Sequence, residues 1–537
     1  MASEGLRCGS ALAWAETVSQ VAFMQRDEMP LTRRLRQEIL FARERVQRFG
    51  RATPLEKLVL AGRGPEIWVK REDLCAIKAY KWRGAANRMS VLTEEERSRG
   101  VVTASAGNHA QGVALAAQQL GVKARIYMPG SSPRVKQQAV LHHGMEWVEI
   151  VLSGDSYDEA VVAARKDEVA TGAVYVHAYD DLQVMAGQGT LADEVVMSGE
   201  GPFDAAFLQI GGGGMAAGVS CWLQTYWPEM QLIGVEGAGQ ASMKAALAAG
   251  KPVALDEVDL FCDGTAVRRA GDLPFEICRE TLMRMITVSN AEVSQAMRVL
   301  WEGLRAVSEP SGAMGLAAVL QEREKWIGKK VLVVLCGANI DFQQLGVIAQ
   351  STGTGALAAR TVRVNIPERP GAMLALLDGC FAGLNIADFQ YGKSDRNEAW
   401  PVLTVTGSDV AGVASLPERL LAAGVAWQEL DGAVDVQFRA IPLRANLLDY
   451  PLFLRLDFYE RVGALHDFLD TVIRGRASFC YFNYRQSGER IGRALIGLDF
   501  DNAASRGTFR AALPGRGPGY RQCRVVEDDV TLRLLGR

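Results

Sequence analysis

The stretch Gln209-Ile-Gly-Gly-Gly-Gly-Met-Ala-Ala-Gly218 decides how this chain folds. It follows an apolar run at 205–210 that predicts a buried strand, and it leads into an alanine-rich run that predicts a helix. Four glycines at such a junction permit left-handed backbone angles and leave backbone N–H groups free to hold a phosphate monoester. No Gly-Lys-Ser/Thr follows, so a nucleotide P-loop is not indicated, and a purely structural turn is the alternative.

The same alternation of strand and helix extends from about residue 50 to 345. Further strands are expected at 67–70, 101–105, 124–128, 174–179, 231–236 and 330–336. This order predicts an α/β fold with open, mostly parallel sheets. Glycines at 107, 211–214 and 337 each follow one of these strands, and ligands of such sheets bind at the carboxyl ends of strands.

Segments of different composition flank this region. Residues 1–50 are expected to form a partly helical extension, 51–345 the main α/β domain and 346–360 a linker. Beyond the linker, Ile366-Pro-Glu-Arg-Pro-Gly-Ala-Met and Phe458-Tyr-Glu-Arg-Val-Gly-Ala-Leu repeat each other at an offset of 92 residues. The repeat predicts two small α+β modules, at 361–440 and 441–537.

Composition excludes several classes of protein. The 59 Lys and Arg against 62 Asp and Glu give a net charge of −3, which speaks against nucleic-acid binding, and the apolar runs are too short to span a membrane. The nine cysteines form no CxxC, so neither a disulfide framework nor a structural zinc site is expected. The five histidines show no metal-ligand spacing, so no metal is expected. We expect a cytoplasmic protein, or an organellar one in a eukaryote.

Two more segments carry candidate chemistry. In Ala79-Tyr-Lys-Trp-Arg-Gly-Ala85, Lys81 precedes a predicted helix. Burial and the helix N-terminus would lower the pKa of its amine and permit Schiff-base formation, although a solvated charge is the alternative. In Thr103-Ala-Ser-Ala-Gly-Asn-His-Ala-Gln-Gly112, a strand followed by a glycine and a helix offers free N–H groups to a carboxylate. His109 in this segment is expected to pack at the helix start.

These segments belong to a larger ordered set. It includes Ala186-Gly-Gln-Gly-Thr-Leu191, Asp263-Gly-Thr-Ala-Val267, Ser308-Glu-Pro-Ser-Gly-Ala313 and Cys336-Gly-Ala-Asn339. The set resembles the fold-type II pyridoxal-phosphate enzymes and, among them, is most similar to the biosynthetic threonine dehydratases, also called threonine deaminases. The C-terminal repeat resembles their pair of ACT-like regulatory modules. The resemblance implies a catalytic domain of two open, mostly parallel sheet subdomains, followed by two α+β ACT-like modules.

The resemblance also implies roles for individual residues. Lys81 matches the lysine that forms the Schiff base with pyridoxal 5′-phosphate, and Asn108 matches the asparagine facing the cofactor's ring oxygen. Cys336 falls where the family usually has a serine opposite the ring nitrogen, and Glu309 falls near the ring. The phosphate group would bind at Gly211, Gly212, Gly213, Gly214 and the Met215 amide. The substrate would bind at Ser105, Ala106, Gly107, Asn108 and His109.

The implied reaction converts L-threonine to 2-oxobutanoate and ammonia, the first step of isoleucine biosynthesis. Ala79 and Cys336 depart from the family, which commonly has serine at both positions. A thiol is a weaker hydrogen-bond donor than a hydroxyl, but it can still act as a neutral partner. Ala106 stands where serine racemases have a second serine as an acid, so elimination is favoured over racemisation.

By the same resemblance, the ACT-like modules would bind isoleucine as inhibitor and valine as activator in a homotetramer. Gly371 and Gly463 hold the position where the family's effector pocket forms. The alternative for these modules is a dimerisation scaffold. Two alternatives for the whole chain are a broader serine/threonine dehydratase, which the double repeat disfavours, and a non-catalytic amino-acid sensor, which the retained Lys81 and Asn108 disfavour.

Overall fold

The computed structural model describes residues 29–130, 132–353, 358–367, 372–390, 398–407, 410–430, 445, 448–459, 467–474, 476–485, 491–527 and 530–531. Gly371 and Gly463, which were predicted to line effector sites, lie outside the described residues. The chain divides into two compact units. The first unit ends at Asn339, and the second begins at Ile340 and also takes in Pro129–Arg134 and Gly154–Ser156.

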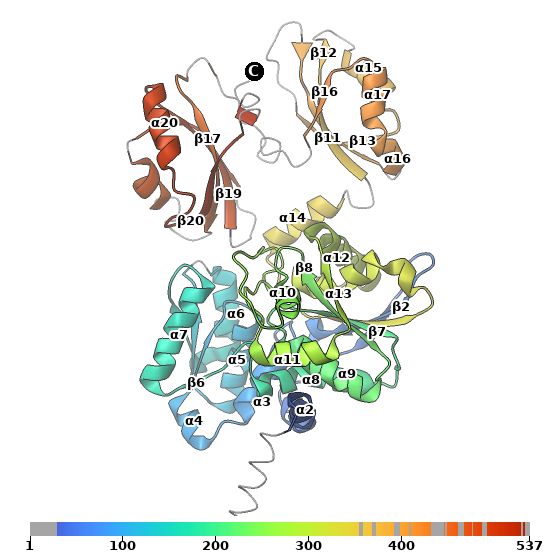
Figure 1. The fold of residues 1–537 in the computed structure, drawn as a ribbon, viewed down its shortest axis with the longest axis vertical. Coiled ribbons are helices and arrows are strands. Elements are labelled where there is room, and N and C mark those ends of the chain that lie inside the picture. Colours follow the sequence, from blue (N-terminus) through green and yellow to red (C-terminus); the bar gives the residue numbers. More distant parts are fainter. Residues whose placement is uncertain are drawn as a thin grey trace, which may run out of the picture. The chain divides into compact units, whose positions relative to one another are not determined.

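A six-stranded sheet forms the centre of one half of the first unit (Figure 1). Its strands, in spatial order, are β1 (Leu55–Leu58), β2 (Glu66–Arg71), β10 (Lys330–Leu335), β7 (Ala205–Gln209), β8 (Gln231–Gly237) and β9 (Arg284–Val288). All neighbours are parallel except β1 and β2. The inner strands are buried on both faces, which explains their nearly continuous apolar sequences.

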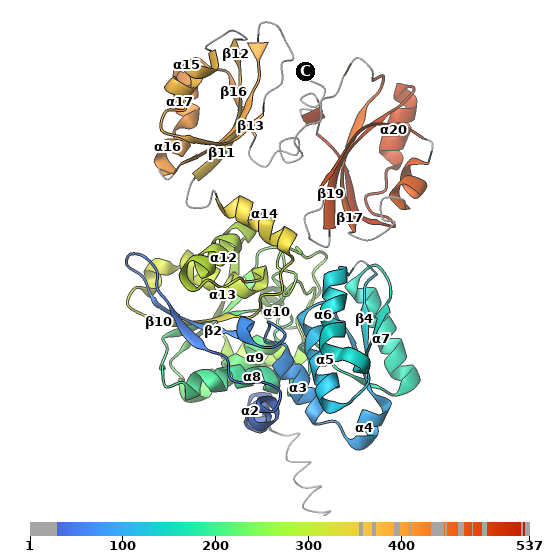
Figure 2. The ribbon, with the colours of Figure 1, turned by 180° about the vertical axis from the view of Figure 1, so that it is seen from behind.

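A four-stranded parallel sheet forms the other half, as Figure 2 shows beside α5 and α6. Its order is β5 (Val148–Leu152), β4 (Ala124–Met128), β3 (Val101–Ala104) and β6 (Val174–Tyr175). The predicted strand at 174–179 is wrong beyond Tyr175: the Val176 amide still donates to the Val102 carbonyl of β3 at 2.9 Å, but the amides of Tyr179 and Asp180 donate to His177 instead. The helices of this half are α3 (Trp82–Ser90), α4 (Glu94–Arg99), α5 (Asn108–Leu120), α6 (Arg134–Gly144) and α7 (Tyr157–Thr171).

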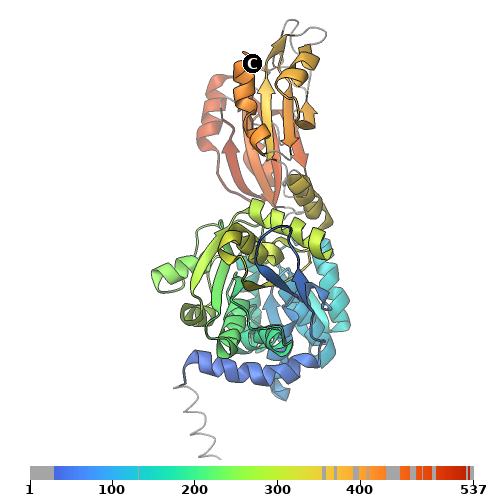
Figure 3. The ribbon, with the colours of Figure 1, turned by 90° about the vertical axis from the view of Figure 1, so that its right-hand side faces the viewer.

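The helices associated with the larger sheet are α2 (Leu31–Gln47), α8 (Leu182–Met197), α9 (Gly214–Tyr226), α10 (Ser242–Ala249), α11 (Asp272–Thr281), α12 (Asn290–Leu304) and α13 (Pro310–Gln321). One buried core joins α2, α8 and α9 to the sheet. Helix α2, blue in Figure 3, buries Leu35, Ile39, Ala42 and Val46 at helical spacing. The predicted extension therefore contributes a helix to the catalytic core. Short 3₁₀ turns lie at Glu72–Leu74, Met145–Trp147 and Arg323–Trp326.

The second unit contains the predicted internal repeat. After α14 (Phe342–Gly353), which runs into the predicted linker, comes an antiparallel sheet in the order β13 (Asn385–Gln390), β15 (Val402–Gly407), β11 (Ala358–Val364) and β16 (Trp427–Glu429). A second antiparallel sheet has the order β18 (Ser478–Arg485), β19 (Ile491–Asp499), β17 (Leu452–Tyr459) and β20 (Tyr520–Val525). Numbered along the chain, both sheets have the strand order 2-3-1-4, which is that of a βαββαβ module.

Helices cover each sheet of the repeat at corresponding points in the sequence. They are α15 (Ala372–Gly379), α16 (Val410–Ala414) and α17 (Leu416–Ala422) in the first copy, and a π-helical turn (Leu469–Ile473) and α20 (Ala503–Ala512) in the second. The first copy also has a two-stranded pair, β12 (Ile366–Pro367) and β14 (Glu398–Ala399). The predicted fold, an α/β catalytic part followed by two α+β modules, is confirmed.

Candidate active site

Lys81 immediately precedes the first residue of α3, and its side chain is partly buried. Its Nζ donates a hydrogen bond of 3.1 Å to the carbonyl oxygen of Ala178. Burial lowers the pKa of this amine to about 8, while the nearby Cys336 and Glu309 act in the opposite direction. A substantial fraction of the amine is therefore neutral near pH 8, which is the form a nucleophile or general base needs.

The backbone around Lys81 is fixed to the end of strand β10. The amide of Tyr80 donates to the carbonyl of Cys336 at 3.0 Å, and the amide of Ala338 donates to the carbonyl of Lys78 at 2.8 Å. Helix α5 approaches from another side at Gly112, where an added Cβ would lie 3.1 Å from the Lys81 carbonyl. Two predicted motifs, around Lys81 and around Cys336, therefore lie side by side.

Asn108, the first residue of α5, is held at both ends of its amide. Its Nδ2 donates to the two carboxylate oxygens of Glu309 at 2.9 and 3.1 Å. Its Oδ1 accepts a hydrogen bond of 2.7 Å from Asn339, which also donates to the carbonyl of Ile77. Burial raises the pKa of Glu309 to about 7, with Asp263 adding to the effect. A carboxyl group that titrates near neutrality therefore faces both Asn108 and the Lys81 amine.

The glycine turn begins helix α9 where sequence reasoning placed it. Gly213 has a φ of 97°, in the left-handed region that favours glycine. A Cβ on Gly212 would lie 2.2 Å from the ring of Tyr179, so this position has no room for a side chain. The first N–H groups of the helix have no intrahelical partners and carry its positive dipole end, so the turn suits an anion.

Cys336 is buried at the end of β10. Burial and the neighbouring Glu309 raise the pKa of its thiol, while a contact with the Gln209 side chain acts in the opposite direction. The side chain of Gln209 is itself anchored, with its Nε2 donating to the carbonyl of Val334 at 2.7 Å. The thiol therefore stays protonated, as a neutral group in the centre of the site.

The predicted substrate loop lies between β3 and α5. The Ser105 amide donates to Tyr127 O at 3.0 Å, and the Gly107 amide donates to Ser105 Oγ at 3.3 Å, while Ala106 is buried. His109 is buried, and its Nε2 lies 3.0 Å from the carbonyl of Val176, so it is the donor. Burial, with a contribution from Lys81, lowers the pKa of His109 to about 3, so the ring stays neutral. These contacts agree with a packing role for His109.

Sequence reasoning missed the segment 177–181, which we call the His177 loop. It supplies the carbonyl that accepts from Lys81 and the ring that packs on Gly212. It was missed because an apolar run with aromatic residues reads as strand. Asn339 was quoted in a motif but given no role, and its contact with Asn108 becomes visible only in the folded chain.

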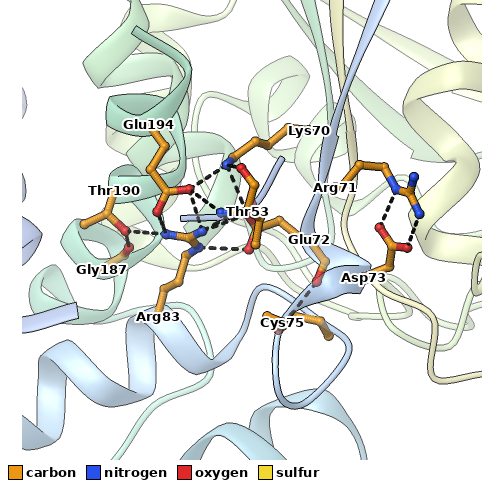
Figure 4. Close-up of polar contacts among 11 residues, drawn as sticks. Thr53, Lys70, Arg71, Glu72, Asp73, Cys75, Arg83, Gly187, Thr190 and Glu194 are labelled. Carbon is orange, nitrogen blue, oxygen red and sulfur yellow. Dashed lines mark hydrogen bonds and ion pairs between the residues drawn. The ribbon is translucent and has the colours of Figure 1, made fainter. Parts of the chain in front are cut away.

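A fully paired charge cluster includes Arg83, two residues after Lys81, and Figure 4 shows its side chains converging. We call it the buried charge cluster; its members are Thr53, Lys70, Glu72, Arg83 and Glu194. Arg83, in α3, donates to Glu72 at 2.8 and 2.9 Å and to Glu194 at 2.6 and 2.9 Å. Lys70 donates to Glu194 at 2.5 Å. The cluster joins β2, α3 and α8 and has balanced charge.

The described residues contain neither a metal-binding cluster nor a membrane-spanning helix. No group of three or more His, Cys, Asp or Glu side chains in that part of the chain is arranged to hold a metal ion. No helix within the same residues is long and apolar enough to cross a membrane.

Comparison with known proteins agrees with this geometry. Residues 46–337 match the family described as "Pyridoxal-phosphate dependent enzyme". The chain is 35% identical over 496 residues to "L-threonine dehydratase biosynthetic IlvA" of Haemophilus influenzae, covering 91% of this chain and 93% of that protein. It is 34% identical to "Threonine dehydratase biosynthetic, chloroplastic" of Arabidopsis thaliana, covering 88% and 79%.

Among solved structures, the processed form of threonine deaminase isoform 2 from Solanum lycopersicum is similar, with a TM-score of 0.57 and 36% identity, covering 60% of this chain and 88% of that one. The fold and the family match define a pyridoxal-phosphate-dependent enzyme of fold type II. Within that class, the chain belongs to the family of biosynthetic threonine dehydratases.

Proposed function

We propose that the chain catalyses the deamination of L-threonine to 2-oxobutanoate and ammonia, with pyridoxal 5′-phosphate bound at Lys81. The observation that carries the proposal is the state of the Lys81 amine. It is partly buried, its pKa is lowered to about 8, and the carbonyl of Ala178 directs it. The names of the relatives, which are threonine dehydratases, support the choice of substrate.

The residues present fit the cofactor. The glycine turn at the start of α9 offers backbone N–H groups to a phosphate, and Gly212 leaves no space for a side chain there. Gly211, Gly212, Gly213, Gly214 and the Met215 amide would hold the phosphate group. Asn108 would face the ring oxygen, and Cys336 would face the ring nitrogen.

When bound, pyridoxal phosphate supplies an electron sink for the bond that breaks at the substrate's Cα. Lys81, as a neutral amine, would take the proton from that carbon. Ser105, Ala106, Gly107, Asn108 and His109 would hold the substrate carboxylate at the N-terminus of α5. Cys336 keeps its proton and has no charge, so it would leave the ring nitrogen unprotonated and favour loss of the β-hydroxyl. Ala106 offers no acid for reprotonation, which favours elimination.

The test combines trapping with turnover. After borohydride treatment of the purified protein, mass spectrometry should find the cofactor on Lys81, and the adduct should be lost in Lys81→Ala. Lys78→Ala, which changes an exposed lysine three residues earlier, is the matched control and should keep the adduct. Formation of 2-oxo acid should be measured from L-threonine and from L-serine, and equal rates would favour a broader dehydratase. An adduct elsewhere, or none, would contradict the proposal.

We also propose that the two C-terminal modules regulate the enzyme. Their shared 2-3-1-4 strand order supports duplication of one module. Isoleucine would inhibit and valine activate, in a homotetramer, through sites that include Gly371 and Gly463. Replacing Gly371 by Trp should relieve inhibition by isoleucine and spare basal activity, and unchanged inhibition would remove the site assignment. The proposed compartment is the cytoplasm, or an organelle in a eukaryote, and free cysteines in the described residues support it.

A further inference from the structure

The His177 loop connects the two halves of the first unit. It follows β6 of the four-stranded sheet and ends at Asp181, the N-cap of α8, whose side chain accepts from the amide of Val184 at 2.9 Å. Asp181 also pairs with Arg88 of α3 at 3.1 Å. The loop is therefore fixed to the helix that follows Lys81 as well as to the larger half.

One side of the loop contacts the reactive amine. The carbonyl oxygen of Ala178 accepts a hydrogen bond from Lys81 Nζ at 3.1 Å. A carbonyl can only accept, so it orients the amine in both the neutral and the charged state. The direction in which the amine points therefore depends on the backbone conformation of the loop.

The other side of the loop contacts the glycine turn. An added Cβ on Gly212 would lie 2.2 Å from the Tyr179 ring, and one on Gly214 would lie 2.8 Å from the Tyr179 carbonyl. Asp180 accepts hydrogen bonds from the amides of Asp272 and Leu273, at 3.0 and 2.9 Å, at the start of α11. The turn before α11 returns to the glycine turn, since the Gly271 amide donates to the Gly212 carbonyl at 3.0 Å. Consecutive loop residues thus contact the amine and the phosphate site.

The ring of His177 stabilises this loop through hydrogen bonds to the loop's own backbone. Its Nδ1 accepts from the amides of Tyr179 and Asp180, at 3.2 and 2.8 Å. The ring also packs against Tyr175 and Tyr179, with centroid distances of 5.9 and 4.6 Å. Accepting through Nδ1 requires a neutral ring, and burial lowers the pKa of His177 to about 4, so it remains an acceptor at neutral pH. These two hydrogen bonds hold the bend of the backbone at 178–180.

We infer that His177 is a positioning residue: through the loop it sets the placement of the Lys81 amine relative to the glycine turn that would hold the cofactor's phosphate. The inference rests on the proposed function, because it concerns how the same site receives its cofactor. His177 touches neither the amine nor the glycine turn by any contact described above, and it acts through the conformation of Ala178 and Tyr179.

Two substitutions separate the acceptor from the ring. His177→Phe keeps an aromatic ring but has no acceptor. His177→Asn lacks the ring but places Oδ1 one atom beyond Cγ, as Nδ1 is, and asparagine commonly accepts from amides two and three residues later. The Phe variant should raise the dissociation constant for pyridoxal phosphate roughly ten- to a hundredfold, as expected for two lost hydrogen bonds. The Asn variant should restore most of this affinity. His142→Phe, at an exposed histidine, is the control.

A second background distinguishes positioning from simple damage to the phosphate site. In Lys81→Ala, the cofactor has no amine to reach, so the loss caused by His177→Phe should be much smaller than in the wild-type background. Equal losses in both backgrounds would overturn the inference, as would a Phe variant that binds as tightly as wild type. If the Phe variant does not fold, His177→Gln takes its place, because its carbonyl is one atom too distant.

Failure of the inference can be told from failure of the proposed function. If borohydride does not trap the cofactor on Lys81 in the wild-type protein, the proposed function fails, whatever the His177 variants do. If the wild type is trapped at Lys81 and both His177 variants bind like wild type, only the positioning role fails.

Discussion

Replacing Arg83 by Met tests whether the buried charge cluster holds the start of α3 in place. Methionine keeps an unbranched apolar stem and removes the guanidinium. Lys70 then remains with two carboxylates, at 2.5 Å from Glu194 and 3.9 Å from Glu72, so the cluster acquires a net negative charge. Glu72 has no exposed surface and cannot regain water as a partner.

The expected cost follows from what Glu72 and Glu194 lose. Arg83 donates two hydrogen bonds to each carboxylate, all between 2.6 and 2.9 Å. Removing one partner of a buried ion pair destabilises a protein by about 3–5 kcal/mol, because a buried charge is left uncompensated. The control is Arg48→Met, which removes an arginine that pairs with Glu44 on the exposed face of α2. Exposed pairs of this kind contribute about 0–1 kcal/mol.

The pH dependence gives a second signature. Burial pushes the pKa of Glu72 upward, but Arg83 and Lys70 outweigh it and hold the pKa below its ordinary value. In the wild type, the stability that this lowered pKa provides is fully present above the pKa of Glu72 in the unfolded chain. It is lost as the pH falls through the pKa of Glu72 in the folded protein. Without Arg83, burial should raise the pKa of Glu72 above its unfolded value. Protonation of Glu72 then removes the uncompensated charge as the pH falls, and the variant regains part of its stability. The difference in the free energy of unfolding between Arg83→Met and wild type should therefore be smaller at pH 5 than at pH 8.

Urea unfolding followed by circular dichroism measures these differences, with all variants compared at the same protein concentration. Adding Glu72→Gln to the Arg83→Met variant removes the uncompensated charge and should recover part of the loss. The reasoning is refuted if the free energies of unfolding of Arg83→Met and Arg48→Met agree within about 1 kcal/mol at pH 8. It is also refuted if the loss of stability in Arg83→Met does not become smaller at lower pH.

Three shorter predictions concern the site. An unfolded histidine has a pKa near 6.5, whereas the pKa of His177 in the folded protein is about 4. Between pH 7 and pH 5 the free energy of unfolding of wild type should therefore fall by about 2 kcal/mol more than that of His177→Asn, as measured by urea unfolding with His142→Asn as control. An equal fall in wild type and His177→Asn would contradict this. Cys336→Ser should tighten cofactor binding a few-fold in an absorbance titration, because a hydroxyl is the better hydrogen-bond partner, and weaker binding would argue against contact with the ring. Gly212→Ala should abolish cofactor binding, since the new methyl group would meet the Tyr179 ring, while Gly346→Ala, where nothing lies within 4 Å, should not.

Much of the fold and part of the site could be predicted because they depend on local patterns. The glycine turn and the segment around Asn108 each lie between an apolar strand and a helix, and ligands of open parallel sheets bind at the carboxyl ends of strands. The repeat around Ile366 and Phe458 was visible as direct similarity. These features need no knowledge of which distant residues meet.

The rest depended on contacts between distant residues. The run 174–179 has the composition of a strand, yet β6 ends at Tyr175, and the amides of Tyr179 and Asp180 donate to the ring of His177. Glu309 and Asn108 are 201 positions apart, so no spacing rule joins them. Strand β1, with Glu56 and Lys57 at its centre, carries too little apolar pattern to be recognised as a strand.

One short motif, from Lys70 to Ala85, therefore combines two kinds of lysine. Lys70 is fully buried and forms an ion pair with Glu194. Lys81 is partly buried and has no carboxylate within salt-bridge distance among the described residues. Arg83, two residues after Lys81, donates to the Glu72 and Glu194 carboxylates that also pair with Lys70. Burial lowers the pKa of both amines, but at Lys70 a carboxylate in direct contact opposes this effect, whereas at Lys81 none of the described carboxylates is in direct contact. The buried charge cluster thus holds the helix while leaving Lys81 free to react.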